Sequence, residues 1–239
     1  LGPIARNGMI APMIACLYDV HGNLPALDAV LADAREAGAS GYLVGGDVAL
    51  FGAYPAETVA RLRALPNARW LRGNGERWTA APQEAPDDAT VQSAIAAARA
   101  ALGIELVMEL GHLPESVGLG SDTRAWHGSP AGDVLSFLPE PAPSDAELLA
   151  GVTERRLIFG HTHLPFRRRH GDIELVNPGS VGMPLDGDRR AAYALLHPDG
   201  TVEHRRVDYP LEDVLATLRG RSDEEWTGEV AGRLERAAF

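Results

Sequence analysis

The first third of the chain alternates short apolar runs with amphipathic segments. Residues 13–18 (MIACLY) predict a buried strand, and residues 24–38 carry apolar side chains at helical spacing. The alternation continues with a strand at 41–46, a helix at 55–65 and a strand at 68–71. Strands separated by helices in this way predict right-handed crossovers and a largely parallel sheet covered by helices, an α/β fold.

The middle of the chain is less regular and predicts a helical insertion at about 82–112. Residues 82–90 are polar and turn-forming, whereas residues 91–110 predict one or two helices with a break at Gly103. This position, between the third strand and the next strand-like run, places the insertion above the sheet.

A second group of strands follows the insertion. Its members are short and separated by Gly, Pro or Asp turns, which favours an antiparallel sheet packed against the first. A short helix is expected at 146–151, and a helical tail at about 210–239 that lies on the surface or contacts a partner. The predicted strands of this group are 116–120, 122–127, 156–160, 165–170, 172–176, 191–197 and 201–207.

The composition is that of an ordinary globular protein, with 45% hydrophobic and 23% charged residues. One domain is predicted over residues 9–239, with residues 1–8 outside it as a cloning remnant or a disordered leader. The single cysteine, Cys16, excludes an intramolecular disulfide and favours the cytoplasm. No apolar stretch approaches the roughly 18 residues of a membrane span, so no membrane association is expected.

Acidic residues outnumber basic ones, 33 to 22, which gives a formal net charge of −11. Affinity for nucleic acids comes mainly from Lys and Arg side chains that neutralise phosphates. The balance therefore argues against a partner such as long DNA or RNA.

Polar side chains follow the predicted buried strands. Ligands of open α/β sheets bind beyond the carboxyl ends of the strands, so five chain segments are expected to bring these side chains to one edge. Asp19 and His21 are two positions apart, as are His161 and His163, which lets each pair project toward one side. The oxygen and nitrogen donors are Asp19, His21, Asp47, Asn74, His127, His161 and His163.

These residue types fit a metal site better than a nucleophilic triad. Without a cation, buried carboxylates and imidazoles would be left unsatisfied or with strongly shifted pKa values. Imidazole, carboxylate and amide ligands without a thiolate favour manganese, iron or zinc over calcium. The alternative, that these residues only cap and hydrogen-bond at strand ends, is disfavoured by their pairing and by their recurrence after apolar runs.

Six motifs in a fixed order resemble the calcineurin-like metallophosphoesterase superfamily, and within it the small bacterial phosphodiesterases. The similarity runs from about residue 13 to residue 186, and the ordered set is far more specific than any one motif. The motifs are DVHGN (19–23), GGDVALFG (45–52), RGNGE (72–76), HGSP (127–130), GHTH (160–163) and NPGSVG (177–182).

The resemblance implies an αββα sandwich of two mixed sheets flanked by helices, with two divalent metal ions at the carboxyl ends of the strands. It also implies metal-dependent hydrolysis of small phosphoesters, above all phosphodiesters, by a hydroxide that bridges the ions. On this pattern one ion is held by Asp19, His21, Asp47 and His163, and the other by Asp47, Asn74, His127 and His161.

The chain departs from the family where Gly75 replaces the histidine that usually protonates the leaving group. Loss of a general acid costs about 10² to 10⁴ in rate for poor leaving groups. Asn74 is expected to touch a phosphoryl oxygen as well as a metal ion. Glu76, or a metal-bound water, is the candidate substitute for the missing acid.

Other residues flank the candidate ligands. Trp70 and Trp126 are expected in the core, and Tyr18 replaces a smaller residue without consequence for the metals. Asn23 is expected either to orient a ligand or to cap the first helix. The turn at 177–182 is expected to support the site.

Two other functions remain open. A protein Ser/Thr phosphatase would need a basic or aromatic surface for a phosphopeptide, and the sequence identifies none. A non-catalytic scaffold, as in a retromer subunit that resembles this fold, is disfavoured by the retention of all the expected ligands. Two ions would add about +4 against about −3 from two carboxylates and a hydroxide, so the acidic balance does not disfavour phosphate chemistry at the site itself.

Overall fold

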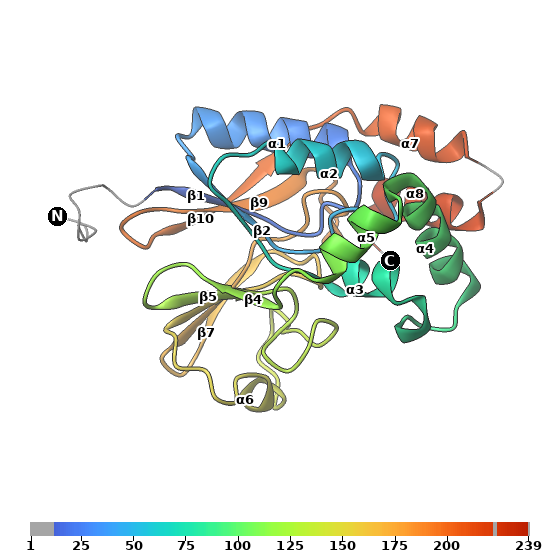
Figure 1. The fold of residues 1–239 in the computed structure, drawn as a ribbon. Helices are drawn as coiled ribbons and strands as arrows, with labels where there is room; N and C mark the ends of the chain where they lie inside the picture. The colour runs from blue at the N-terminus through green and yellow to red at the C-terminus, as the bar shows by residue number, and fades with distance from the viewer. Residues whose placement is uncertain (1–11, 222–223, 239) are drawn as a thin grey trace.

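Two five-stranded β-sheets pack face to face in the computed structural model, which describes residues 12–221 and 224–238 (Figure 1). The first sheet has the strand order β10-β9-β1-β2-β3 and the second the order β4-β5-β6-β8-β7. Both contain parallel and antiparallel pairs, which confirms the predicted α/β sandwich of two mixed sheets. The strands are β1 (Ile14–Leu17), β2 (Gly41–Val44), β3 (Ala68–Trp70), β4 (Ser116–Gly118), β5 (Thr123–Trp126), β6 (Arg156–Ile158), β7 (Phe166–His170), β8 (Ile173–Asn177), β9 (Ala191–Leu196) and β10 (Val202–Val207).

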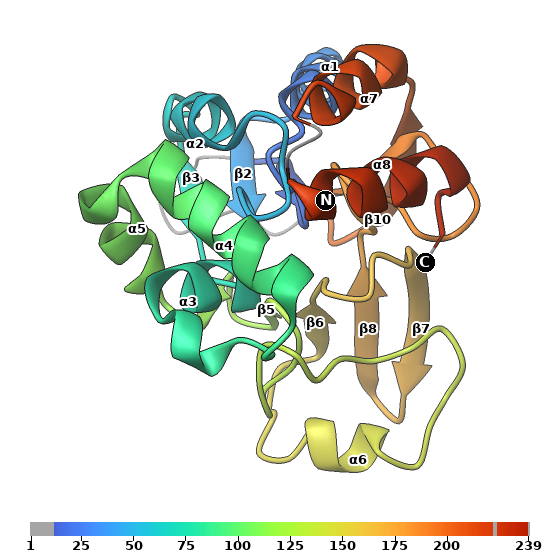
Figure 2. The ribbon, with the colours of Figure 1, turned by 90° about the vertical axis from the view of Figure 1, so that its right-hand side faces the viewer.

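Helices cover the outside of the sandwich and one of its ends (Figures 1 and 2). Helices α1 and α2 lie over the outer face of the first sheet, whereas α6 lies beyond the second sheet. The helices are α1 (Leu24–Glu36), α2 (Pro55–Arg63), α3 (Asn74–Ala80), α4 (Ala89–Leu102), α5 (Ile104–Gly111), α6 (Asp145–Leu148), α7 (Leu211–Arg219) and α8 (Glu225–Arg236), with a 3₁₀ turn at Pro82–Glu84.

The parallel arrangement predicted for the first three strands is confirmed, but the predicted antiparallel second sheet is wrong in two respects. Strands β5, β6 and β8 are parallel neighbours, and β9 and β10 join the first sheet instead of the second. Turn residues indicate where a strand ends, but they do not indicate which strand it pairs with in the sheet. The long connection between β5 and β6 leaves room for a crossover, which parallel pairing requires.

Side chains of β1 alternate between two parts of the core. Ala15 and Leu17 pack against the helices outside the first sheet, whereas Cys16 and Tyr18 belong to the cluster between the two sheets. This burial on both faces explains why the segment is uniformly apolar.

The expected insertion and tail pack against each other. Helices α4, α7 and α8 share one apolar cluster, in which Ile95, Leu218 and Trp226 are almost fully buried. The tail is thus anchored to the insertion and is not only a surface helix. Helix α3 was not predicted from the hydrophobic pattern, although Gly73 and Glu76 have the spacing of a helix start.

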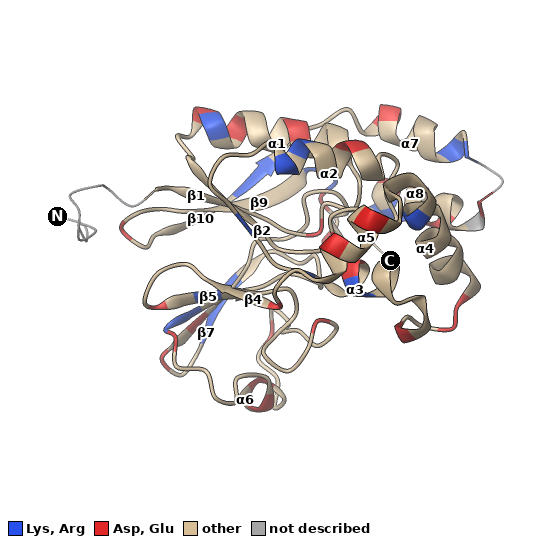
Figure 3. Cartoon of the chain, viewed as in Figure 1, with Lys and Arg blue, Asp and Glu red and all other residues tan. Residues whose placement is uncertain are grey.

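The domain prediction for residues 9–239 stays a prediction. The expected leader at residues 1–8, and residues 9–11, 222–223 and 239, lie outside the described residues. Within the described ranges, no single helix is long and apolar enough to span a membrane; α4 and α5 together meet that test but are bent by 112°. Figure 3 shows acidic and basic positions interspersed along the outer helices.

Tyr18 joins the two sheets immediately before the first candidate ligand. Its side chain is fully buried, and its hydroxyl donates a hydrogen bond to the carbonyl oxygen of Ile158 at 3.1 Å. A Cβ atom on Gly45 would lie 2.3 Å from the Tyr18 ring, and one on Gly160 would lie 2.5 Å from it. The two glycines therefore make room for this tyrosine, which was expected only to have no consequence for the metals.

We predict that Gly45→Ala lowers the free energy of unfolding by about 1–3 kcal/mol, because the added methyl group overlaps the Tyr18 ring in a closely packed core. Gly228→Ala is the matched control, since a Cβ on Gly228 meets no atom within 4 Å and alanine favours its helix. Urea denaturation measures both. Equal stability of Gly45→Ala and wild type would contradict this packing.

Candidate metal centre

Most of the candidate ligands leave their strands through an unusual backbone conformation. Left-handed φ angles are uncommon for residues other than glycine, although Asp, Asn and His adopt them more readily than most. Such residues concentrate where a site imposes the conformation. The candidate ligands with a positive φ are Asp19 (52°), His21 (45°), Asp47 (51°), His161 (69°) and His163 (59°).

Backbone hydrogen bonds join the loops that carry these residues. The amide of Asp19 donates to the carbonyl oxygen of Gly46 at 3.2 Å, and that of His21 donates to the carbonyl oxygen of Asp47 at 2.9 Å. The amide of His161 donates to the Asp19 carboxylate at 3.1 Å, which links the second sheet to the first. These bonds bring three of the five predicted segments together at one edge of the sandwich.

Three histidines are oriented by backbone carbonyl groups. The Nδ1 atom of His21 contacts the carbonyl oxygen of Leu50 at 2.8 Å, and that of His127 contacts the carbonyl oxygen of Gly45 at 2.8 Å. His163 does the same with Met183 at 2.6 Å. A carbonyl oxygen only accepts hydrogen bonds, so Nδ1 of each ring carries a proton. In a neutral ring, as expected for His21 and His163, Nε2 is then left with a free lone pair. Metal-binding histidines are commonly fixed in this way.

The lone pairs of His21 and His163 face each other. Their Nε2 atoms are 3.2 Å apart, and both rings are buried. With both Nδ1 atoms protonated, neither neutral ring has a proton to donate across this contact. The contact is therefore repulsive unless a cation or an additional proton lies between the rings.

Asp19 presents a second unsatisfied group. Its Oδ1 atom is buried without a hydrogen-bond partner in the described part of the chain, and it lies 3.6 Å from His163 Nε2 and 3.7 Å from His127 Nε2. Two sets of three residues each have their ligand atoms within 4.8 Å of one another. The first set is Asp19, His21 and His163, and the second is Asp19, Asp47 and His127.

Asp47 and Asn74 connect the remaining donors. Asp47 Oδ2 is 4.0 Å from His21 Nε2, while its Oδ1 is 3.5 Å from His127 Nε2. Asn74 Oδ1 lies 3.1 Å from His127 Nε2 and 2.9 Å from His161 Nδ1. All the donors proposed from the sequence thus lie in one continuous cluster, with Asp47 between its two sides.

The pKa values of the cluster are set mainly by burial. Burial lowers the pKa of His21 and His163, and it lowers that of His161 to about 4. Burial also acts to lower the pKa of His127, but the carboxylates of Asp47 and Asp19 outweigh it and raise this pKa to about 9. Without a cation, most of these imidazoles are neutral at pH 7 and so able to bind metal.

The two carboxylates behave differently. Burial raises the pKa of Asp19 to about 8, against the opposing effect of His127. Burial would also raise the pKa of Asp47, but His127, His21 and the amide of Gly75 together lower it below its usual value. The cluster therefore retains protons on Asp19 and His127 at neutral pH.

Gly75 is packed directly against Asp47. Its amide donates a hydrogen bond to Asp47 Oδ1 at 2.6 Å, and a Cβ atom at this position would lie 2.8 Å from the same oxygen. The missing histidine is thus accompanied by close packing of the carboxylate around the glycine. A larger residue here requires Asp47 to shift.

Both oxygens of Glu76 are occupied by backbone amides. Oε1 accepts a hydrogen bond from Val48 at 2.8 Å, and Oε2 accepts from Asp47 at 2.8 Å and from Gly73 at 2.7 Å. Glu76 is buried, which raises its pKa, while these amides act in the opposite direction. Its carboxylate ties the start of α3 to the loop that carries Asp47.

The segment after β8 forms hydrogen bonds with residues of the cluster and with Asn23. Ser180 Oγ donates to the carbonyl oxygen of Asp19 at 2.7 Å, and Met183 orients His163. Asn23 caps α1 by accepting from the amide of Ala26, and its Nδ2 donates to the carbonyl oxygen of Gly182. The structure thus resolves the role of Asn23 in favour of a cap that also holds this segment.

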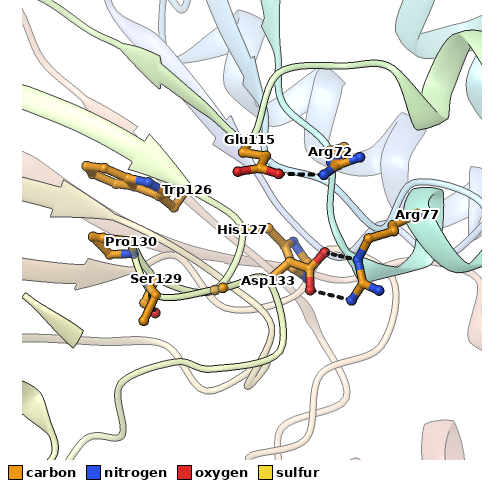
Figure 4. A pocket seen from close by; sticks show the side chains of 11 residues that line it. Arg72, Arg77, Glu115, Trp126, His127, Ser129, Pro130 and Asp133 are labelled. Atoms are coloured by element: carbon orange, nitrogen blue, oxygen red, sulfur yellow. Dashed lines mark hydrogen bonds and ion pairs between the residues drawn. The ribbon is translucent and has the colours of Figure 1, made fainter. Parts of the chain in front are cut away.

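A cavity of about 300 Å³ adjoins His127 (Figure 4). Hydrophobic periodicity placed Trp126 in the core, yet this side chain is half-buried and lines the cavity. Arg72 and Ser129 also line it and belong to the RGNGE and HGSP motifs. The remaining polar lining residues belong to no motif and were not expected at the site; they are Arg77, Glu115 and Asp133.

Several known proteins are similar to this chain in sequence, in fold or in both. A protein of Methanocaldococcus jannaschii named as uncharacterized, MJ0912, is 30% identical, over 92% of this chain and 98% of the relative. Phosphodiesterase YfcE of Escherichia coli is 29% identical, over 76% of this chain and 85% of the relative. The crystal structure of a metallophosphoesterase from Sphaerobacter thermophilus superposes with a TM-score of 0.81 at 27% identity and covers 95% of this chain and 100% of that one.

A family model described as the calcineurin-like phosphoesterase superfamily domain matches residues 13–201, a range that contains every candidate ligand. Together with the two mixed sheets and the cluster at their edge, this match agrees with the resemblance read from the motifs. The chain belongs to the calcineurin-like phosphoesterase superfamily.

Proposed function

We propose that this protein hydrolyses small phosphodiesters with two divalent cations bound at the cluster. The observation that carries the proposal is the pair of unprotonated Nε2 atoms of His21 and His163 at 3.2 Å, beside the unpartnered Oδ1 of Asp19. Three electron-rich atoms directed at one point fit a cation. The proposed ligands are Asp19, His21, Asp47, Asn74, His127, His161 and His163.

The residues of the chain fit the chemistry expected of such a centre. Divalent cations would lower the pKa of a bound water and stabilise charge on phosphoryl oxygens. Asp47 suits a position shared by two ions, because its oxygens face His21 and His127 respectively. Nitrogen and oxygen donors without sulfur support manganese, iron or zinc. We propose that Asn74 also touches a phosphoryl oxygen.

Preference for diesters is supported by the relative named as a phosphodiesterase and by the absence of a histidine at position 75. Without this acid, esters with good leaving groups should react fastest. Glu76, considered as a substitute acid, has both oxygens engaged with backbone amides. We propose that it positions Asp47 instead. The single cysteine, Cys16, supports a location in the cytoplasm.

Asp47→Asn should reduce turnover of bis(p-nitrophenyl) phosphate by more than about 100-fold, because it removes a charge that both ions require. The protein would be reconstituted with manganese, iron or zinc, and bound metal measured by elemental analysis. Asp28→Asn is the matched control, since Asp28 is exposed and pairs with Arg61 on the outer helices. Turnover that does not depend on Asp47 with any of the metals would contradict the enzymatic proposal and favour a scaffold.

Metal binding at pH 7 should release protons. Asp19 and His127 have pKa values raised to about 8 and about 9 in the metal-free cluster, so both are largely protonated at pH 7, and a cation displaces these protons. Affinity for Mn²⁺ should therefore rise with pH through this range. Calorimetric titration in two buffers of different ionisation enthalpy measures the release. Affinity that is independent of pH between 6 and 9 would refute the assigned protonation.

Glu76→Gln should lower kcat/KM by about 10- to 100-fold, by a similar factor for every leaving group. The amide nitrogen introduced by glutamine faces a backbone N–H donor, so Asp47 loses part of its support. A lost proton donor would instead cost more as the pKa of the leaving group rises. Aryl phosphodiesters of graded leaving-group pKa separate the two roles, with exposed Glu36→Gln as control. A loss that grows with leaving-group pKa would restore Glu76 as the acid.

A further inference from the structure

The cavity beside His127 is suited in size and position to one ester group of a substrate. His127 belongs both to the metal cluster and to the cavity wall, so a group attached to a phosphate at the cluster would reach the cavity directly. Its volume of about 300 Å³ is at the lower end of small-molecule sites. This volume fits a single ester group.

Both arginines of the cavity wall are paired with acidic side chains. Arg77 forms a two-point ion pair with Asp133, with both N–O distances 2.7 Å, and Arg72 pairs with Glu115 (Figure 4). Because each guanidinium group already has a carboxylate partner, a second anionic group would have to displace one. The lining therefore favours an uncharged group that offers both hydrogen-bond donors and acceptors.

Arg72 retains an unused donor. It donates to the carbonyl oxygen of Gly111 and to Glu115, but its Nε atom is buried without a hydrogen-bond partner in the described ranges. A buried donor without a partner is costly, but this atom has almost no exposed surface, so a group in the cavity would reach it only if the Arg72 side chain shifted.

The other side of the cavity is formed by Trp126 and Pro130. Trp126 packs against the outer cluster of the second sheet, and the guanidinium group of Arg124 lies 5.8 Å from its ring centroid. These contacts restrain the indole ring. A restrained aromatic ring beside ion-paired side chains is suited to stacking with a flat partner on the face that Arg124 does not cover.

We propose that this cavity binds the ester group that remains on the phosphate, and that it selects a planar, uncharged group with hydrogen-bond donors and acceptors, as in a nucleoside. This proposal rests on the proposed function, since the phosphorus atom must lie at the metal cluster. A sugar alone would satisfy the polar wall but would present no flat face to Trp126.

Three substrates with the same p-nitrophenolate leaving group test the selection: the methyl, 2-deoxyribose-5-yl and thymidine-5′-yl p-nitrophenyl phosphates. The thymidine ester should have a kcat/KM about tenfold above the other two, the size of one stacking contact. Trp126→Ala should remove most of this preference and Trp126→Phe should keep it. Trp78→Phe, on α3 outside the cavity, is the control and should change none of the ratios.

Binding of uncharged thymidine to the metal-free protein, measured by calorimetry, supplies a readout that needs no turnover. Wild type should bind thymidine about tenfold more tightly than Trp126→Ala. Equal kcat/KM for the three esters, or equal binding of thymidine by the two proteins, would overturn the cavity proposal while Asp47-dependent hydrolysis still supported the function. Thymidine binding without any Asp47-dependent hydrolysis would instead reject the function and support the cavity as a nucleoside site.

Discussion

The burial of mutually repelling ligand atoms at one edge of the sandwich is the constraint on which the rest of the structure depends. Two imidazole nitrogens with free lone pairs face each other at 3.2 Å, and a carboxylate oxygen beside them has no partner among the described residues. Such an arrangement persists only when the surroundings hold it. Here the surroundings act in three ways: backbone carbonyl groups contact three histidines, five candidate ligands have a left-handed backbone, and backbone amides bind Glu76. The fold thus holds these ligand atoms close together although they repel one another.

The chain's sequence is enough to predict the parts of this arrangement that depend on local order. An apolar run followed by Asp19 or by His161 is visible in the pattern, because a buried strand and the polar residue at its end are neighbours. The sheet membership of β9 and β10 and the parallel pairing of β6 are not visible, because they depend on which distant segments compete for a strand edge. The left-handed conformations escape prediction for a similar reason, since they are imposed by the packed loops and not by the residue itself.

The role of a residue also depends more on the atoms that surround it than on its type. Glu76 stands beside the missing histidine in sequence, which suggested an acid, yet three backbone amides already occupy its oxygens. Tyr18 was expected to have no consequence for the metals, yet its ring requires glycine at position 45 and at position 160. Tyr18 directly precedes Asp19, and Glu76 is two positions after Asn74. Packing around the centre thus restricts which residues can stand beside the candidate ligands.

The acidic charge of the chain is compatible with its proposed chemistry if bound cations, and not basic side chains, attract the phosphate. Cations would attract the phosphate, so the chain needs no basic surface for this purpose, and its formal charge of −11 still disfavours long nucleic acids. The guanidinium groups nearest the cluster are neutralised by Glu115 and Asp133 and so are poorly placed to add a second phosphate site. Recognition by the chain itself would then depend on shape, stacking and hydrogen bonds. A cavity with paired arginines and one restrained tryptophan is suited to this kind of selectivity.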